Sequence, residues 1–207
     1  MSETLDQLAA ARLVPVVVLD DAAHARPLAG ALVEGGLPVA EVTFRTAAAA
    51  AAIEQMAADG RVLVGAGTVL TPAQVDQAVD AGARYVVSPG LSREVVERCA
   101  ERGVPALPGA VTATEVQAAL AAGISTVKFF PAETSGGAAA IKALSAPFGD
   151  VRFVPTGGIG PKNLADYLSL SSVAAVGASW LVPPAAPPAR PFEDVAAMVA
   201  EAVALTR

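Results

Sequence analysis

The 207-residue chain has little cysteine, few aromatic residues and no excess of positive charge. Its one cysteine, Cys99, excludes an internal disulfide framework and is typical of proteins in a reducing compartment. The formal net charge of -6 argues against a basic surface for nucleic acid or for an anionic membrane. No apolar run is long enough to span a membrane, and the N-terminus lacks the pattern of a signal peptide. We therefore expect a cytoplasmic protein with no nucleic-acid or membrane partner.

Metal ligands are scarce as well. His24 is the only histidine, and the carboxylates do not cluster at spacings typical of metal ligands. We therefore expect no metal site and no other cofactor. By contrast, 54% of the residues are hydrophobic and only 16% are charged, which is enough apolar material for a substantial core.

Short apolar runs rich in β-branched residues alternate along the chain with alanine-rich amphipathic segments. The runs predict eight strands, at residues 14–19, 39–44, 62–64, 85–88, 106–107, 126–130, 152–156 and 173–177. The segments that follow them predict helices at residues 22–34, 47–58, 72–81, 93–101, 113–121, 138–145, 161–168 and 192–205.

This alternation predicts an α/β protein with the architecture of a closed (β/α)8 barrel, the TIM barrel. We expect a single domain over residues 1–207. A short N-terminal helix precedes the first strand, and the proline-rich residues 183–191 form a connector before the last helix. An open doubly wound sheet is the alternative architecture, but no dinucleotide-binding fingerprint follows the first strand.

Lys128 lies between Val127 and Phe129 in a predicted strand that is otherwise mostly apolar. Burial of an ammonium group costs free energy, so such a lysine tends to lose its proton. An uncharged amine attacks ketones, which is the chemistry of Schiff-base enzymes. The alternative is a lysine at the strand edge whose stem is buried while its ammonium group reaches water.

Strand side chains alternate between two faces, and this alternation gathers polar residues on one of them. The faces that we expect to point into the barrel carry Glu41, Thr43 and Arg45; Thr126, Lys128 and Phe130; and Val64, Ala66 and Thr68. A glutamate and a lysine inside one barrel would each perturb the protonation of the other, as expected of a functional site. A structural ion pair in the core would have the same pattern, and alternation does not separate the two.

Glycines follow the last two predicted strands, in Thr156-Gly157-Gly158-Ile159-Gly160-Pro161 and in Gly177-Ala178-Ser179. Glycines let backbone N–H groups approach an anion closely, and barrels often bind substrate phosphate after strands seven and eight. Either cluster alone is also typical of an ordinary turn. Two clusters after consecutive strands favour a phosphate site.

Six motifs occur in the order in which one enzyme family carries them. They are Glu41-Val42-Thr43-Phe44-Arg45-Thr46, Gly65-Ala66-Gly67-Thr68-Val69-Leu70, Ser88-Pro89-Gly90, Lys128-Phe129-Phe130-Pro131-Ala132-Glu133, Pro155-Thr156-Gly157-Gly158-Ile159 and Gly177-Ala178-Ser179-Trp180-Leu181-Val182-Pro183. From about Val14 to Pro183 the chain closely resembles the class I aldolases that act on 2-dehydro-3-deoxy-6-phosphogluconate (KDPG) and 4-hydroxy-2-oxoglutarate (KHG).

This resemblance implies a metal-independent carbon–carbon lyase that binds a small-molecule substrate and assembles as a homotrimer. It implies cleavage of KDPG to pyruvate and glyceraldehyde 3-phosphate, and also of KHG to pyruvate and glyoxylate. The roles that it implies are Schiff-base lysine for Lys128, general acid/base for Glu41, carboxylate binding for Arg45 and Thr68, an apolar wall for Pro89 and Phe130, stereochemical control for Thr156, and phosphate binding for Gly157, Gly158 and Ser179.

Two other functions remain open from the residues themselves. A sugar-phosphate epimerase or isomerase would use the same phosphate-binding barrel, but it would leave Lys128 without a covalent role. A non-catalytic anion-binding barrel would contain a lysine that forms no adduct with a ketone.

Overall fold

The computed structural model describes residues 3–182 and 192–206 of the chain. The strands are Leu13–Val17 (β1), Val39–Thr43 (β2), Leu63–Gly67 (β3), Val86–Val87 (β4), Ala106–Leu107 (β5), Thr126–Phe129 (β6), Arg152–Pro155 (β7) and Val176–Ala178 (β8). The α-helices are Glu3–Ala11 (α1), Ala25–Glu34 (α2), Ala49–Ala57 (α3), Pro72–Asp80 (α4), Arg93–Glu101 (α5), Ala113–Ala121 (α6), Gly137–Ser145 (α7), Leu164–Leu168 (α8) and Phe192–Ala204 (α10). Short 3-10 helices occur at Ala22–His24 (η1) and Glu133–Ser135 (η2). Each predicted strand overlaps an observed one, and the predicted connector 183–191 lies outside the described residues.

Side-chain caps fix where several helices begin. The hydroxyl of Thr71 accepts a hydrogen bond from the Gln74 amide, and the proline that follows Thr71 occupies the start of α4, where no amide hydrogen is needed. The hydroxyl of Thr112 accepts from the Glu115 amide, while the Glu115 carboxylate accepts from the Thr112 amide at the start of α6. This reciprocal capping box satisfies two amides that have no partner inside the helix.

The strands form two parallel sheets. Six strands pair in the order β5-β4-β3-β2-β1-β8, and the remaining two, β6 and β7, form a separate pair. The prediction of a closed (β/α)8 TIM barrel is therefore wrong, because the hydrogen-bonded ladders do not run around all eight strands. Only isolated bridges lie in the two gaps: Gly109 with Lys128 on one side, and Phe153 with Val173 and Thr156 with Gly177 on the other.

The short strands next to the first gap explain why the ladder stops there. The strand β5 is two residues long and is flanked by Pro105 and Pro108. Proline has no amide hydrogen to donate to a neighbouring strand, so neither residue can extend the ladder as a donor. Beyond β5, the carbonyl of Pro108 accepts from the Lys128 amide at 2.8 Å and the Ala110 amide donates to the Lys128 carbonyl at 2.9 Å, which gives the isolated bridge at Gly109. A pattern of eight apolar runs predicts the strands but not the pairs that they form.

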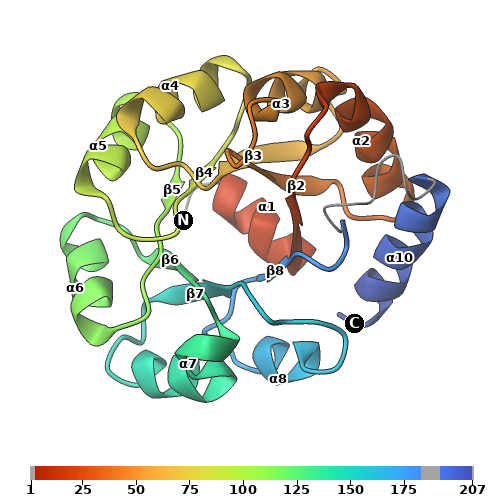
Figure 1. Ribbon diagram of the computed structural model, residues 1–207. Coiled ribbons are helices and arrows are strands. Elements are labelled where there is room, and N and C mark those ends of the chain that lie inside the picture. Colours follow the sequence, from red (N-terminus) through yellow and green to blue (C-terminus); the bar gives the residue numbers. More distant parts are fainter. Residues whose placement is uncertain (1–2, 183–191, 207) are drawn as a thin grey trace.

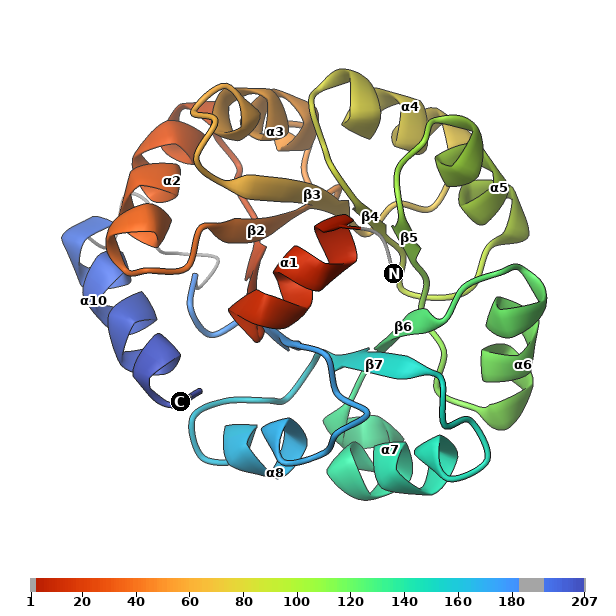
Figure 2. The same cartoon turned by 180° about the vertical axis from the view of Figure 1, so that it is seen from behind.

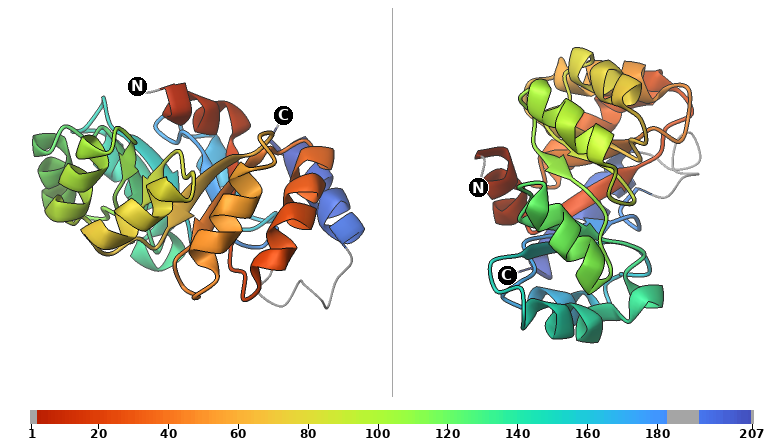
Figure 3. Two further views of the ribbon diagram at one scale, coloured as in Figure 1. Left: turned by 90° about the horizontal axis from the view of Figure 1, so that it is seen from above. Right: turned by 90° about the vertical axis from the view of Figure 1, so that its left-hand side faces the viewer.

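The helices lie around the outside of the two sheets, and the strands lie inside (Figure 1). The helix α1 crosses one end of this interior, as the view from behind shows (Figure 2), and it projects beyond that end in the side views (Figure 3). A cavity beneath α1 is lined by residues at the starts of β2 and β3, so α1 covers the amino ends of these strands. The carboxyl ends, where α/β folds of parallel strands carry their sites, lie at the other end.

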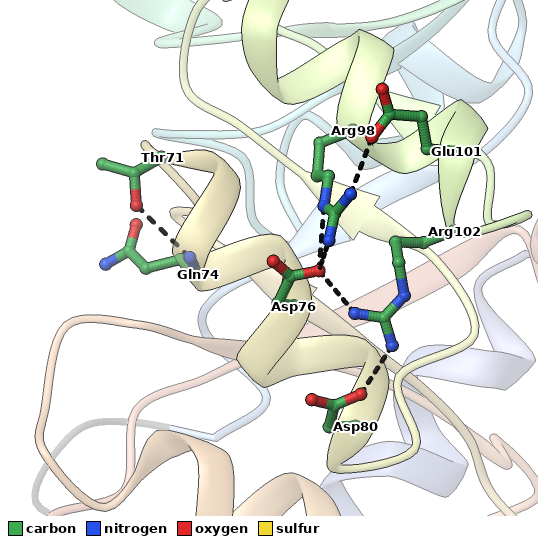
Figure 4. Close-up of polar contacts among 7 residues, drawn as sticks. All are labelled: Thr71, Gln74, Asp76, Asp80, Arg98, Glu101 and Arg102. Carbon is green, nitrogen blue, oxygen red and sulfur yellow. Dashed lines mark hydrogen bonds and ion pairs between the residues drawn. The ribbon is translucent and has the colours of Figure 1, made fainter.

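A charged network joins the neighbouring helices α4 and α5 (Figure 4). The carboxylate of Asp76 accepts from both Arg98 and Arg102, and Arg102 also donates to Asp80. The two guanidinium groups lower the pKa of Asp76 through these hydrogen bonds.

Among residues 3–182 and 192–206, no helix is both long enough and apolar enough to cross a bilayer.

Candidate active site

A lysine and a glutamate from the two different sheets meet in the interior. Nζ of Lys128, on β6, donates a hydrogen bond to Oε1 of Glu41, on β2, over 3.0 Å. Only 8% of the lysine side chain and 4% of the glutamate side chain are exposed. The alternative of an ammonium group that reaches water is therefore wrong, and the inward orientation predicted from strand alternation is confirmed for this pair.

Burying a charged lysine and a charged glutamate together has a free-energy cost. Removing two charges from water costs several kcal/mol per ion, and their attraction offsets that cost only when the geometry is good. In the described part of the chain, Lys128 forms no ion pair other than the one with Glu41. The contact alone fits either a structural ion pair or an acid/base pair beside a nucleophile.

Gly67, on β3, lies against the carboxylate of Glu41. A Cβ atom at position 67 would be 2.7 Å from Cγ and 2.8 Å from Cδ of Glu41, and nearer still to Oε1. Gly65 is in register with Glu41, so residues 65 and 67 share its inward face. The expectation that Val64 and Ala66 point into the interior is therefore wrong: these side chains take the opposite face of β3.

Tyr85 fills the space that Gly65 leaves open. A Cβ atom at position 65 would overlap the ring of Tyr85, which is fully buried and donates its hydroxyl to the Ala40 carbonyl over 2.7 Å. Burial raises the pKa of Tyr85 well above its usual value, and the charge of Glu41 adds to the shift. Neither Gly67 nor Tyr85 was among the predicted site residues, although two glycines inside one strand are a known sign of close approach by a neighbouring group.

Arg45 and Thr68 both lie just beyond the carboxyl ends of paired strands, because β2 ends at Thr43 and β3 ends at Gly67. Strand alternation therefore does not apply to either residue. Arg45 lies in an exposed turn. Thr68 has φ +57, a left-handed conformation that is rare and strained for a β-branched residue. Such strain at the carboxyl end of a strand that carries part of the site is typical of functional positions.

An aromatic ring and a proline lie on the β6 side of the site. The ring centroid of Phe130 is 5.3 Å from Nζ of Lys128, and 37% of Phe130 is exposed. Pro89 reaches the same region through Gly109, because a Cβ atom at position 109 would overlap the Pro89 carbonyl. Gly109 in turn forms the bridge with Lys128. Both predicted wall residues are thus near the lysine strand.

Thr156 presents a buried hydroxyl with no hydrogen-bond partner in the described residues. Its amide donates to the Phe129 carbonyl over 3.0 Å, which ties it to the end of the lysine strand. Gly177 makes room for the Thr156 side chain, since a Cβ atom at position 177 would overlap its hydroxyl. A buried hydroxyl without a partner costs free energy unless a ligand supplies the missing bond.

The predicted phosphate residues lie on two adjacent turns. Gly157 and Gly158 have φ +105 and +77, backbone conformations that side chains larger than glycine rarely adopt. Ser179 is exposed in the turn that follows β8. The bridge between Thr156 and Gly177 places the ends of β7 and β8 side by side.

Comparison with known proteins separates the three functions that the sequence left open. The chain matches the family model of KDPG and KHG aldolase over residues 5–198. The chain belongs to this aldolase family. It is 51% identical to the 2-dehydro-3-deoxy-phosphogluconate aldolase of Treponema pallidum over 96% of this chain and 95% of that protein.

Two solved structures resemble the aldolase closely. The KDPG aldolase of Legionella pneumophila, with pyruvate captured as a covalent carbinolamine intermediate, has a TM-score of 0.92 at 39% identity, over 97% of this chain and 98% of that one. The aldolase of Zymomonas mobilis with 3-phosphoglycerate has a TM-score of 0.91 at 41% identity, over 99% and 96% of the two chains. These likenesses favour the aldolase over the epimerase and over the anion-binding protein.

Other features of the aldolase lie away from Lys128. The cavity beneath α1, of about 510 Å³, is lined at the amino ends of the strands by residues that include Arg61 and Arg84. Cys99 is buried, and burial raises the pKa of its thiol to about 12. Among the residues that the structure describes, no group of three or more histidine, cysteine, aspartate or glutamate side chains could hold a metal ion.

Proposed function

We propose that this aldolase cleaves KDPG to pyruvate and glyceraldehyde 3-phosphate through an imine on Lys128. The observation that carries the proposal is the buried contact of 3.0 Å between the Lys128 amine and the Glu41 carboxylate. A carbinolamine is the adduct of an amine with a ketone, and the Legionella relative holds pyruvate in that form. The chain has three lysines, and Lys142 and Lys162 are both exposed, which leaves Lys128 as the buried amine.

The first half of the reaction forms the electron sink. Glu41 accepts the proton of the Lys128 ammonium group, and the free amine attacks the ketone carbon of the substrate. Glu41 returns this proton to the hydroxyl of the carbinolamine, which leaves as water, so that Glu41 is again a carboxylate. The product is a protonated imine, which withdraws electrons more strongly than the ketone. Glu41 is within hydrogen-bond reach of the amine, so this proton transfer needs no large movement.

The second half of the reaction breaks the carbon–carbon bond and then releases pyruvate. Glu41, directly or through a water molecule, removes the proton of the hydroxyl two carbons from the imine carbon. The carbon–carbon bond breaks and glyceraldehyde 3-phosphate leaves. The electron pair of the broken bond stays with the pyruvyl fragment, which becomes an enamine on Lys128. Glu41 then returns the proton to the enamine carbon, and water hydrolyses the pyruvate imine to free the amine. A positioned acid/base of this kind contributes about 10²- to 10⁴-fold to the rate.

The surrounding residues bind the two ends of the substrate in this proposal. Arg45 and Thr68 hold the pyruvyl carboxylate. Phe130 and Pro89 form the apolar wall around the imine. The Thr156 hydroxyl, which has no partner among the described residues, binds the oxygen on the carbon that becomes the aldehyde. The phosphate binds at Gly157, Gly158 and Ser179, beyond the ends of β7 and β8.

The same groups would cleave KHG to pyruvate and glyoxylate, because this acid also has a hydroxyl two carbons from its ketone. The imine takes the place that a metal ion has in other aldolases, so we propose a metal-independent reaction. We also propose a homotrimer, as the family resemblance implies. The strand–helix alternation supports a single-domain protomer, and the single cysteine supports a cytoplasmic location. Light scattering of the purified protein measures the oligomeric state directly.

Trapping the imine tests the proposal. The aldolase is incubated with pyruvate, reduced with borohydride and digested, and each of the three lysine peptides is weighed. We expect a reduced pyruvyl adduct on Lys128 and none on Lys142 or Lys162, which are exposed on helices or turns away from Glu41. The variant Lys128→Ala should form no adduct and should not cleave KDPG. An adduct-free Lys128, or cleavage by Lys128→Ala, would contradict the proposal.

A further inference from the structure

A buried tyrosine and a glutamate form a contact beside the predicted phosphate turn. Tyr167, on α8, is almost fully buried, and its hydroxyl donates a hydrogen bond to the carboxylate of Glu133, on η2. Burial raises the pKa of Tyr167, and the bond to Glu133 adds to the shift, so the hydroxyl keeps its proton and remains a donor. Neither residue takes part in the reaction steps above.

Glu133 is in direct contact with the turn that follows β7. A Cβ atom at position 158 would be 2.6 Å from Cγ and 2.7 Å from Cβ of Glu133, so the glutamate stem packs on the backbone of Gly158. The Glu133 amide donates to the Gly157 carbonyl over 3.1 Å, and the Ala132 amide donates to the Thr156 carbonyl over 2.8 Å. The segment at Glu133 therefore holds the turn through both side chain and backbone.

Asn163 holds the turn from its other end. Its side-chain amide donates to the Gly158 carbonyl over 3.3 Å, and its side-chain oxygen accepts from the Gly160 amide over 2.8 Å. The carbonyls of three consecutive residues, 156, 157 and 158, are thus all engaged by protein donors.

These carbonyl contacts decide where the amides of the turn point. In a planar trans peptide, the N–H of one residue is directed opposite to the carbonyl of the residue before it. Because the Gly157 carbonyl faces the Glu133 amide, the Gly158 N–H points away from Glu133. Within the described residues, the Gly158 N–H donates to no protein acceptor. The turn presents a fixed and free donor of the kind that binds anions.

We infer that Glu133 and Tyr167 are a positioning pair that aims the amides of Gly157 and Gly158 at the substrate phosphate. This inference rests on the function proposed above. The Tyr167 hydroxyl fixes the Glu133 side chain, the Glu133 stem supports Gly158, and the turn therefore has its binding geometry before the substrate arrives. The pair acts on the phosphate end, because Glu133 contacts the turn that follows β7, whereas Lys128 lies within β6, five residues before Glu133.

Two substrates that differ in their phosphate separate this role from a general structural one. We compare KDPG with KHG, which has no phosphate, in Tyr167→Phe and Glu133→Ala. Loss of one partly buried hydrogen bond should raise KM for KDPG about tenfold in each variant while kcat changes little. The kinetics with KHG should not change. Glu133→Gln keeps an oxygen that accepts from Tyr167, so it should restore the KDPG kinetics.

Inhibition by inorganic phosphate gives a second readout that needs no KHG turnover. The inhibition constant should rise about tenfold in Tyr167→Phe and Glu133→Ala and stay unchanged in Glu133→Gln. Glu54→Ala is the matched control, because Glu54 is an exposed glutamate on the outer helix α3. It should leave all of these constants unchanged.

Three results would overturn the inference: an unchanged phosphate inhibition constant in Tyr167→Phe, an equal loss with both substrates, or a Glu133→Gln variant as impaired as Glu133→Ala. Borohydride trapping in the same proteins distinguishes this failure from failure of the proposed function. A pyruvyl adduct on Lys128 together with any of the three results overturns only the positioning pair. A native protein that forms no adduct overturns the function itself.

Discussion

Replacing Gly67 by alanine should uncouple the glutamate from the lysine. The added Cβ atom would be 2.7 Å from Cγ of Glu41 and closer to Oε1, so the carboxylate must move by about 1 Å to reach an ordinary contact distance. A misplacement of about 1 Å in a catalytic group can cost about 10²-fold in rate. We therefore expect kcat/KM for KDPG to fall about 10²-fold in Gly67→Ala, which corresponds to about 2.7 kcal/mol of transition-state stabilisation.

Two assays separate this effect from loss of the fold. The variant should remain folded, because Gly67 does not have a positive φ and alanine is compatible with its backbone. Thermal unfolding measures this, and borohydride trapping should still find an adduct on Lys128, since the amine itself is untouched. Gly30→Ala is the matched control: position 30 on α2 has open space around it, and its kinetics should equal those of the native enzyme.

Native kinetics in a folded Gly67→Ala protein would refute the reasoning, because Glu41 would then tolerate displacement from Lys128. Loss of adduct formation together with cleavage would also contradict it. That result would mean that the substitution acts on the amine and not on the carboxylate.

Three further predictions concern single groups. Glu41→Gln should lower kcat by about 10²-fold or more, measured by steady-state kinetics, while mass spectrometry still detects the borohydride adduct on Lys128. If kcat and the yield of adduct fell equally, Glu41 would have a structural role. Cys99, whose pKa is about 12, should resist iodoacetamide at pH 8 in the folded protein and react in denaturant, as mass spectrometry will show; fast labelling of the native state would contradict the burial. Hydrogen bonds from the Val111 amide foremost, and from Thr112, lower the pKa of Glu115 below 4.5, so the charged cap stabilises the fold above pH 4.5 and this stabilisation is lost as the pH falls through the lower pKa of the folded state. Glu115→Gln should therefore lower Tm at pH 7 and match the native Tm in strong acid. A difference in Tm that does not depend on pH would contradict the role of the cap.

Local patterns predicted a large part of this fold. Each strand lies where an apolar run predicted it, and alternation along two strands was enough to bring Glu41 and Lys128 together across 87 positions of sequence. That inference works because both residues lie within regular strands, where every second side chain shares a face.

The predictions fail where the pattern of a single strand contains no information. Alternation ends where a strand ends, and Arg45 and Thr68 both lie beyond that point. The closure of the strands also depends on pairing between distant segments, which the prolines around β5 interrupt. The close approach of Gly67 to Glu41 depends on the register of two neighbouring strands, and a single strand pattern does not contain it.

The most direct test of the central claim measures deuterium uptake into the methyl group of pyruvate in heavy water. Uptake requires an imine on the amine and proton transfer at the enamine carbon, so it reports on Lys128 and Glu41 together. We predict uptake by the native aldolase, none by Lys128→Ala, and uptake slowed by about 10²-fold or more in Glu41→Gln although its borohydride adduct persists. Uptake at the native rate in Glu41→Gln, or any enzymatic uptake in Lys128→Ala, would contradict the account.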